Sequence, residues 1–143
     1  MTAMSEERTG VAVIGLGGAV ASTAVAGVEQ LRLGSSTMAG LPFAHRSDLV
    51  PYDSLVFGGW DVRGDDLAKA AHVHRVLDPA LIEAVASQLQ RIEPWPAVAD
   101  PAYCRNATGT NVVAIGRCAS GWRACATTCG ASARSTTSSG SWW

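Results

Sequence analysis

The sequence predicts an α/β protein whose strands form a parallel sheet, and three observations predict it. A β-branched run at residues 11–14 turns through glycines into a stretch of small apolar residues that tolerates a helix. A second apolar run, residues 55–57, passes through two glycines to Trp60 and Asp61. Beyond it, apolar residues recur at helical spacing. Short strands that alternate with helices are typical of parallel sheets.

The first unit is predicted as a strand over residues 10–16 and a helix over residues 18–32, which Gly34 terminates. Gly15 permits the tight turn between them, and Gly17 and Gly18 let the backbone come close to a ligand. The unpaired N–H groups at such a helix N-terminus bind anions, and a dinucleotide pyrophosphate is the usual one.

This dinucleotide fingerprint is incomplete. Its third glycine is replaced by Val20, with Ala21 as the nearest small residue. The acid expected about 20 residues further on is missing, because Glu29 lies inside the helix. The glycines alone leave two interpretations open, a dinucleotide site or a tight strand–helix turn.

A third interpretation, a membrane span, starts from the uncharged run at residues 10–28. That run is mostly Ala, Gly, Ser and Val, which transfer poorly into lipid, and Glu6, Glu7 and Arg8 before it do not form a secretory leader. We therefore expect a cytoplasmic protein with no membrane partner.

The second unit begins after a connecting loop at residues 38–51, which contains His45. Residues 55–62 are predicted as a strand that ends in Asp61 at the carboxyl edge of the sheet, where open α/β sheets bind ligands. Asp61 is therefore a delayed candidate for the missing acid. The alternative for Asp61 is a helix N-cap or a turn aspartate.

Two helices are predicted to follow. The first begins near Gly64, with Asp65 or Asp66 as its cap, and its His72 and His74 are expected at the surface because residues two apart face different sides of a helix. The second begins at Asp78-Pro79 and ends at Pro94-Trp-Pro96. Its buried face is predicted to hold four apolar residues at helical spacing: Leu81, Val85, Leu89 and Ile92. Residues 100–110 are predicted as a loop and residues 111–114 as a short apolar exit.

Composition excludes several classes of protein. The length of 143 residues allows one domain. The net charge is −1, and 16% of the residues are charged. No basic run suggests a nucleic acid partner. Four cysteines are present, but none has the paired Cys or Cys/His spacing of a zinc site, so no metal is predicted.

The tail, residues 116–143, has no aliphatic residue larger than alanine and no periodicity. It cannot bury a core and is predicted to be disordered. We interpret it as a frame-shifted reading. If the codons are rich in G and C, a shifted frame from Gly116 encodes P-L-R-E-R-V-A-R-L-R-D-D-L-R, an amphipathic helix, and the last tryptophans become valines. Sequencing the DNA around the Gly116 codon tests this hypothesis.

With these elements placed, residues 10–114 resemble the inositol-3-phosphate synthase (myo-inositol-1-phosphate synthase) family. The resemblance rests on Gly15-Leu-Gly-Gly-Ala-Val-Ala-Ser-Thr, on Val56-Phe-Gly-Gly-Trp-Asp-Val, on Val76-Leu-Asp and on Pro94-Trp-Pro followed by Asp100-Pro. The second of these is the most specific. The resemblance implies a truncated Rossmann-type NAD-binding domain over residues 10–115, between a flexible N-terminus (residues 1–9) and the tail.

The resemblance also implies site residues. Gly18, Ala19, Val20 and Ala21 are expected on the pyrophosphate of NAD, and Asp61 on its ribose side. Ala97 and Val98 are expected near the adenosine. Many members have an Asn-Asn pair where this chain has Ala19-Val20, so backbone groups must replace side-chain contacts there.

The family's enzymes are isomerases. They oxidise glucose 6-phosphate at carbon 5 with NAD, close carbon 6 onto carbon 1, and reduce the product to inositol phosphate, for inositol and phospholipid biosynthesis. The family's catalytic residues lie beyond this chain, so none is assigned. The printed chain is expected to be inactive and poorly folded, because its sheet lacks the later strands. A homotetramer is expected for the full-length family only. The alternative is a small non-catalytic dinucleotide-binding module with a disordered tail.

Overall fold

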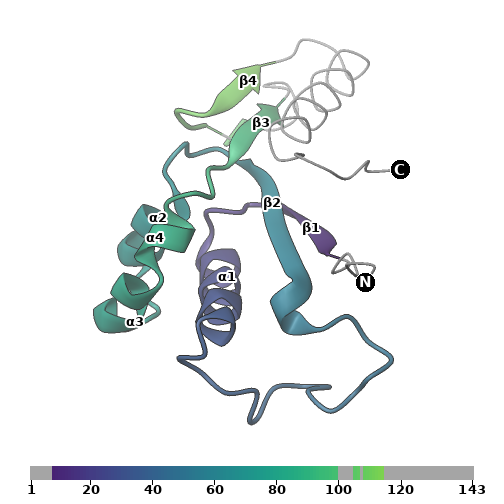
Figure 1. Cartoon of the computed structure of the whole chain (residues 1–143). Coiled ribbons are helices and arrows are strands. Elements are labelled where there is room, and N and C mark those ends of the chain that lie inside the picture. The colour runs from purple at the N-terminus through teal and green to yellow at the C-terminus, as the bar shows by residue number, and fades with distance from the viewer. Residues whose placement is uncertain (1–7, 100–104, 107, 115–143) are drawn as a thin grey trace, which may run out of the picture.

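The computed structural model describes residues 8–99, 105–106 and 108–114, and Figure 1 traces the chain through them. The predicted N-terminal segment lies mostly outside this part, and the tail from residue 116 lies wholly outside it. Strands and helices alternate in the order β1 (Thr9–Ile14), α1 (Ala19–Arg32), the 3₁₀ turn η1 (Tyr52–Ser54), β2 (Leu55–Asp61), α2 (Leu67–His74), α3 (Pro79–Ala84), α4 (Ala86–Leu89), β3 (Trp95–Ala99) and β4 (Val112–Ala114).

The strands form one parallel sheet in the order β1-β2-β3-β4, which confirms the predicted fold class. Strand β1 pairs with β2 along its whole length, from Thr9 opposite Leu55 to Ile14 opposite Trp60. Strand β3 joins β2 only at the end of β2, where Trp95 lies opposite Trp60. It then continues beyond that end and pairs with β4. The carboxyl edge of the sheet is therefore stepped, with β3 and β4 extending beyond β1 and β2.

The glycines of β2 are explained by close packing around that strand. Gly59 lies opposite Val13, and a Cβ on Gly59 would lie 1.9 Å from the carbonyl oxygen of Val13. A Cβ on Gly58 would press on the ring of Trp95 at 3.2 Å. That ring meets Trp60 edge to face, with ring centroids 4.8 Å apart. The Gly-Gly-Trp sequence thus lets β1 and an indole pair fit beside β2.

The hydrophobic core lies between the sheet and the four helices, which Figure 1 shows gathered on one side of the strands. Helix α1 contacts α2 and α4. The core consists of buried aliphatic side chains from the first turn and the helices: Leu16, Val25, Ala26, Leu67, Ala68, Ala71, Ile82, Val85 and Leu89. Val13 and Phe57 pack against this core from the sheet. Because the core reaches into the glycine turn through Leu16, the turn is anchored to it.

The second predicted helix was wrong in three respects. It was predicted to reach Pro94, but α4 ends at Leu89, so Ile92 lies beyond the helix and packs partly buried against the core. It is divided into α3 and α4 at Val85, whose backbone leaves the helical region (φ −116°, ψ 10°). Leu81, predicted to be buried, is 45% exposed, and Ile82 is buried in its place. Since Ile82, Val85 and Leu89 are spaced i, i+3, i+7, the buried stripe exists but begins one residue later than predicted.

Strand β3 is a further difference from prediction. The sequence around Pro94 and Pro96 predicts only the end of a helix, yet Trp95–Ala99 is a strand between β2 and β4. Two prolines and one tryptophan carry no alternating pattern, so β3 depends on its neighbours rather than on its own residues. The short apolar exit predicted at residues 111–114 supplies the last strand, β4.

Candidate functional site

The glycine turn between β1 and α1 is held by backbone hydrogen bonds. The N–H groups of Gly15 and Leu16 both donate to the carbonyl of Trp60, at 2.7 and 3.1 Å. Gly15 has a positive φ of 84°, which favours glycine, and Gly18 donates to the Gly15 carbonyl at 2.9 Å. Leu16 is fully buried. The turn is therefore closed on itself and fastened to the end of β2.

Helix α1 begins with free donors. Its N-cap, Gly18, supplies no side chain, and the first turn contains no acidic residue. Ser22 donates to the carbonyl of Gly18 and starts the helical ladder. Within the part of the chain that the structure describes, no protein group accepts from the N–H groups of Ala19, Val20 and Ala21. Such free donors, together with the positive end of the helix dipole, favour an anion at the carboxyl edge of the sheet.

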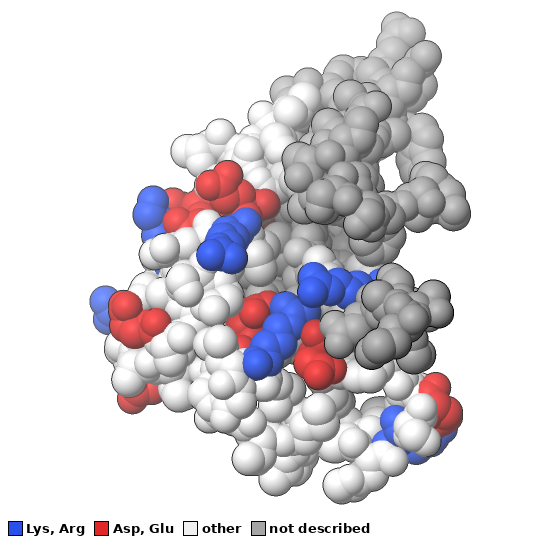
Figure 2. Space-filling view, in the orientation of Figure 1, with Lys and Arg blue, Asp and Glu red and all other residues white. Residues whose placement is uncertain are grey.

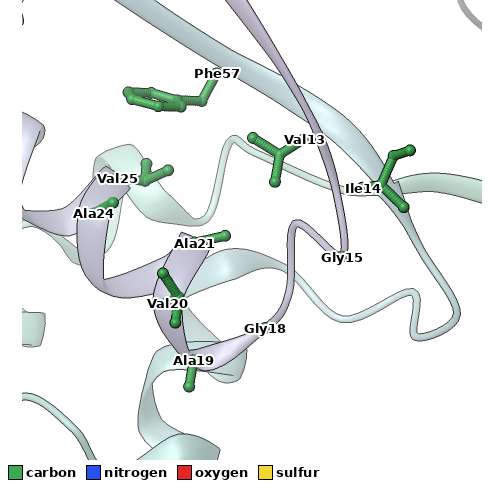
Figure 3. Close-up of a pocket in the computed structure, with 10 residues that line it drawn as sticks. All are labelled: Val13, Ile14, Gly15, Gly18, Ala19, Val20, Ala21, Ala24, Val25 and Phe57. Carbon is green, nitrogen blue, oxygen red and sulfur yellow. The ribbon is translucent and has the colours of Figure 1, made fainter.

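An open hollow of about 400 Å³ adjoins these donors (Figure 3). Its walls come from β1, from the first two turns of α1 and from Phe57 of β2. Figure 3 shows Val20 and Ala21 from the helix and Val13 from the strand around it, whereas the side chain of Ile14 lies on the other side of β1. Ile14 and Val20 are 90% and 85% exposed. An apolar wall beside free N–H groups suits a ligand that carries both rings and phosphates.

Asp61 lies beside the glycine turn at the end of β2. Its Oδ2 accepts from the N–H of Gly17 at 2.9 Å, and its Oδ1 accepts from the N–H of Arg63 at 3.0 Å. A Cβ on Gly17 would lie 3.3 Å from this carboxylate. The structure thus brings together the two features that the sequence places 44 residues apart. Asp61 also acts as a turn residue through Arg63, whereas the cap of α2 is Asp66.

His74 was predicted at the surface, and that prediction was wrong. Its side chain is half-buried, and its Nε2 lies 2.8 Å from the carbonyl oxygen of Gly17. Because a carbonyl oxygen only accepts, Nε2 carries the proton and donates. His72 does face another direction, as predicted, and lies 3.3 Å from Glu83 at the exposed side of α2. No local pattern distinguishes the two histidines, since the partner of His74 is 57 residues away.

Asn111 is a second residue that the sequence did not single out. Its Nδ2 donates to the carbonyls of Asp61 (3.1 Å) and Pro94 (3.2 Å). Its backbone bonds to Val62 and Ala97. Asn111 therefore ties the end of β2, the start of β3 and the start of β4 together, through the backbone carbonyl of Asp61 among others.

Ala97 and Val98 lie in β3, one and two positions past the pair formed by Asp61 and Pro96. They are half-buried and pair with Val112 and Val113 of β4. They therefore share the stepped carboxyl edge with Asp61 but lie two strands away from β1. No hydrogen bond joins them to the glycine turn within the described ranges.

The charged surface is mixed. On the face that Figure 2 shows, acidic and basic side chains of the described residues lie next to one another rather than in separate patches. None of the described helices is both long and apolar enough to cross a bilayer.

The parallel sheet, the uncapped glycine turn and the acid at the end of β2 define a Rossmann-type dinucleotide-binding domain. Comparisons with known proteins identify its family. The family model described as myo-inositol-1-phosphate synthase matches residues 29–127, so the chain belongs to this family. The matched range begins after the glycine turn and runs past Gly116, into the part interpreted above as frame-shifted.

Curated relatives agree with this membership. Inositol-3-phosphate synthase 1 of Bacteroides thetaiotaomicron is 34% identical over 120 residues, covering 73% of this chain and 28% of the relative. Inositol-3-phosphate synthase 1 of Bos taurus is 31% identical over 145 residues, covering 78% of this chain and 26% of the relative. The chain spans about a quarter of the length of these proteins.

A solved structure supports the fold. The crystal structure of inositol-3-phosphate synthase from Caenorhabditis elegans matches with a TM-score of 0.61 and 22% identity, over 78% of this chain and 29% of that one. At this identity the likeness shows the fold alone.

The matched family model is that of an NAD-binding domain, so the cofactor is NAD, as the sequence predicted. The residues present fit this cofactor. No side chain of the described part caps the start of α1, and a Cβ on Gly15 would meet nothing within 4 Å. The space in front of the helix is thus open to a phosphate, and a carboxylate lies beside it.

Proposed function

We propose that this chain is the cofactor-binding start of an inositol-3-phosphate synthase, the isomerase that converts D-glucose 6-phosphate to 1D-myo-inositol 3-phosphate in inositol and phospholipid biosynthesis. The observation that carries the proposal is the uncapped N-terminus of α1 beside Asp61, in a chain that belongs to this family. The full-length protein is proposed to be a cytoplasmic homotetramer.

Each site residue has a distinct role in this proposal. The N–H groups of Ala19, Val20 and Ala21 hold the pyrophosphate. Gly15 leaves open space beside it, whereas a Cβ on Gly17 or Gly18 would press on the Asp61 carboxylate or the Gly15 carbonyl and disturb the turn. Asp61 uses one lone pair on each oxygen for Gly17 and Arg63, so further lone pairs remain for a ribose hydroxyl. Ala97 and Val98 line the adenosine side.

NAD supplies a hydride acceptor and then the hydride donor, so that the sugar is oxidised and reduced within one cycle. The sugar chemistry also needs cationic groups near carbonyl and phosphate oxygens. Lys69 is the single lysine of the chain. Its side chain is 69% exposed on α2 and lies 3.8 Å from Asp65. We therefore assign no catalytic residue here and propose that the chain as printed does not turn over glucose 6-phosphate.

A charge placed in the first turn of α1 tests the site. Val20 is 85% exposed, so Val20→Asp should not disturb packing. The new carboxylate interacts favourably with the positive end of the helix dipole. It should therefore leave the 143-residue chain at least as stable. The same charge competes with the pyrophosphate, so NAD affinity should fall about tenfold or more. Calorimetric titration with NAD, alongside thermal melts, measures both effects.

The neutral variant Val20→Asn is the matched control and should stay within about threefold of the unsubstituted affinity, as expected for an exposed position. Equal NAD affinity in the Asp and Asn variants would contradict the proposed phosphate position. Turnover of glucose 6-phosphate is measured on the product of the same gene with the reading frame after Gly116 restored. Cofactor binding without turnover in that protein would favour the non-catalytic module instead.

A further inference from the structure

Both peptide groups that flank Gly17 are held by side chains from distant parts of the chain. The N–H of Gly17 donates to Oδ2 of Asp61 at 2.9 Å, across 44 residues of sequence. The carbonyl of Gly17 accepts from Nε2 of His74 at 2.8 Å, across 57 residues. Asp61 ends β2 and His74 ends α2, so the ends of two elements meet on one glycine.

The contact with His74 orients the start of helix α1. The carbonyl of Gly17 and the N–H of Gly18 belong to the same peptide group. Its N–H end donates to the Gly15 carbonyl at 2.9 Å, and its carbonyl end accepts from His74. The plane of the peptide group between Gly17 and Gly18 is therefore fixed by a hydrogen bond at each end. The free donors of Ala19, Val20 and Ala21 follow directly, so their direction depends on it.

A glycine turn needs such external support. Glycine loses more conformational freedom on folding than any other residue, and Gly17 and Gly18 carry no side chain of their own that could pack. A phosphate site made of backbone N–H groups binds well only if those groups already point at the ligand, because ordering them on binding reduces affinity. Leu16 anchors one side of the turn in the core. His74 and Asp61 hold the other side.

We propose that His74 is a positioning residue for the dinucleotide: together with Asp61 it clamps Gly17 and holds the turn in its phosphate-accepting conformation. This inference rests on the proposed function, since it assumes that NAD binds at this turn. His74 touches the backbone rather than the cofactor. The left-handed backbone of Arg75 (φ 53°) ends α2 directly after His74 and so places the ring at the helix end.

Two substitutions separate the hydrogen bond from packing. His74→Leu removes the donor but keeps an apolar side chain, and His74→Gln keeps an N–H donor of similar reach. We expect His74→Leu to weaken NAD binding by the 143-residue chain about three- to tenfold, the value of one net hydrogen bond. His74→Gln should recover most of that loss. His72→Leu is the matched control and should change nothing, because His72 faces the exposed side of α2.

A second readout does not depend on NAD. In the ¹⁵N-labelled chain, the amides of Gly17 and Gly18 should exchange slowly with solvent, faster in His74→Leu, and slowly again in His74→Gln. The ring of His74 should carry its proton on Nε2 in the neutral form. The amide exchange rates and the position of the ring proton depend directly on the hydrogen bonds to Gly17, whereas a melting curve measures only overall stability.

The outcomes are distinct. Equal NAD affinity and equal amide exchange in the unsubstituted chain and His74→Leu overturn the inference, and so does a loss that His74→Gln fails to recover. Amides of Gly17 and Gly18 that exchange at the rate of an unstructured peptide in the unsubstituted chain also overturn it. If no form binds NAD but amide protection follows the donor at position 74, the clamp is supported and the proposed function fails.

Discussion

Gly59 and Gly27 leave very different space for a side chain. A Cβ on Gly59 would lie 1.9 Å from the carbonyl oxygen of Val13, inside the pairing of β1 with β2. A Cβ on Gly27, within α1, would meet nothing within 4 Å. The first glycine is required by contact with a neighbouring strand, whereas the second only lowers the helix propensity of α1.

Alanine at each glycine should therefore act in opposite directions. Gly59→Ala must push β1 away from β2 and should lower the free energy of unfolding by about 3 kcal/mol or more. Gly27→Ala should raise it by about 1 kcal/mol, because alanine is the better helix former. Urea unfolding of the 143-residue chain, followed by circular dichroism, measures both. A tolerated alanine at position 59 would mean that β1 and β2 do not pair in this register.

At the scale of elements, Asn111 connects three strands. Its amide donates to the carbonyls of Asp61 and Pro94, and its N–H donates to the carbonyl of Val62 at 3.0 Å. The loop before it runs so close to β2 that a Cβ on Gly109 would lie 2.0 Å from the carbonyl oxygen of Val62. Strands β2 and β3 pair at only two positions. The hydrogen bonds of the Asn111 side chain therefore contribute much to holding the two strands together.

Removing the side-chain amide of Asn111 should lower the free energy of unfolding more than removing another amide from the same loop. Asn111→Ala leaves two partly buried carbonyls without their donor and should cost about 1–3 kcal/mol of unfolding free energy. Asn106→Ala, at an exposed position in the same loop, should stay within about 0.5 kcal/mol of the unsubstituted chain. Chemical denaturation compares the two. Equal effects would show that the junction of β2 with β3 does not depend on Asn111.

The sequence predicts local units of this fold better than long-range contacts. The strand–glycine–helix unit and the strand ending in Asp61 are found as predicted, because each is specified by neighbouring residues: β-branched runs, glycines and small helix-tolerant residues. The two features also meet at one edge, because the carboxyl ends of parallel strands share it.

Other parts of the site could not be predicted in this way. Strand β3 contains two residues, Trp95 and Pro96, that pair with β2 but show no alternation of their own. The roles of His74 and Asn111 are defined by backbone atoms 57 and 50 residues away. A side chain that bonds to a distant carbonyl leaves no signal in local spacing, so a single sequence does not reveal it.

At the scale of the whole molecule, the strand order determines which face of the sheet the helices cover. Crossover connections between parallel strands are right-handed, and the order β1-β2-β3-β4 advances in one direction. All connecting helices of the described part therefore lie on one face, as Figure 1 shows. The opposite face carries Ile14, which is 90% exposed, beside its partner Trp60. Helices can cover that face only if further strands are added beyond β1, where the order reverses.

Substitutions of Ile14 test whether such strands and helices are present in a longer protein, because these elements would cover this side chain. In the 143-residue chain, Ile14→Glu should change the free energy of unfolding by less than about 0.5 kcal/mol, because the side chain is exposed. In a longer protein that follows the hypothesised second reading frame after Gly116, the same change should bury an unpaired carboxylate and cost about 3 kcal/mol or more. Chemical denaturation of both proteins, freed of nucleotide, measures the difference.

The conservative variant Ile14→Val separates burial from charge. It should be neutral in the 143-residue chain and cost about 1 kcal/mol in the longer protein, since a methyl group counts only where it is enclosed. If both variants cost the same in the two proteins, the added sequence does not cover this face. The reversal of strand order beyond β1 would then be wrong for this protein.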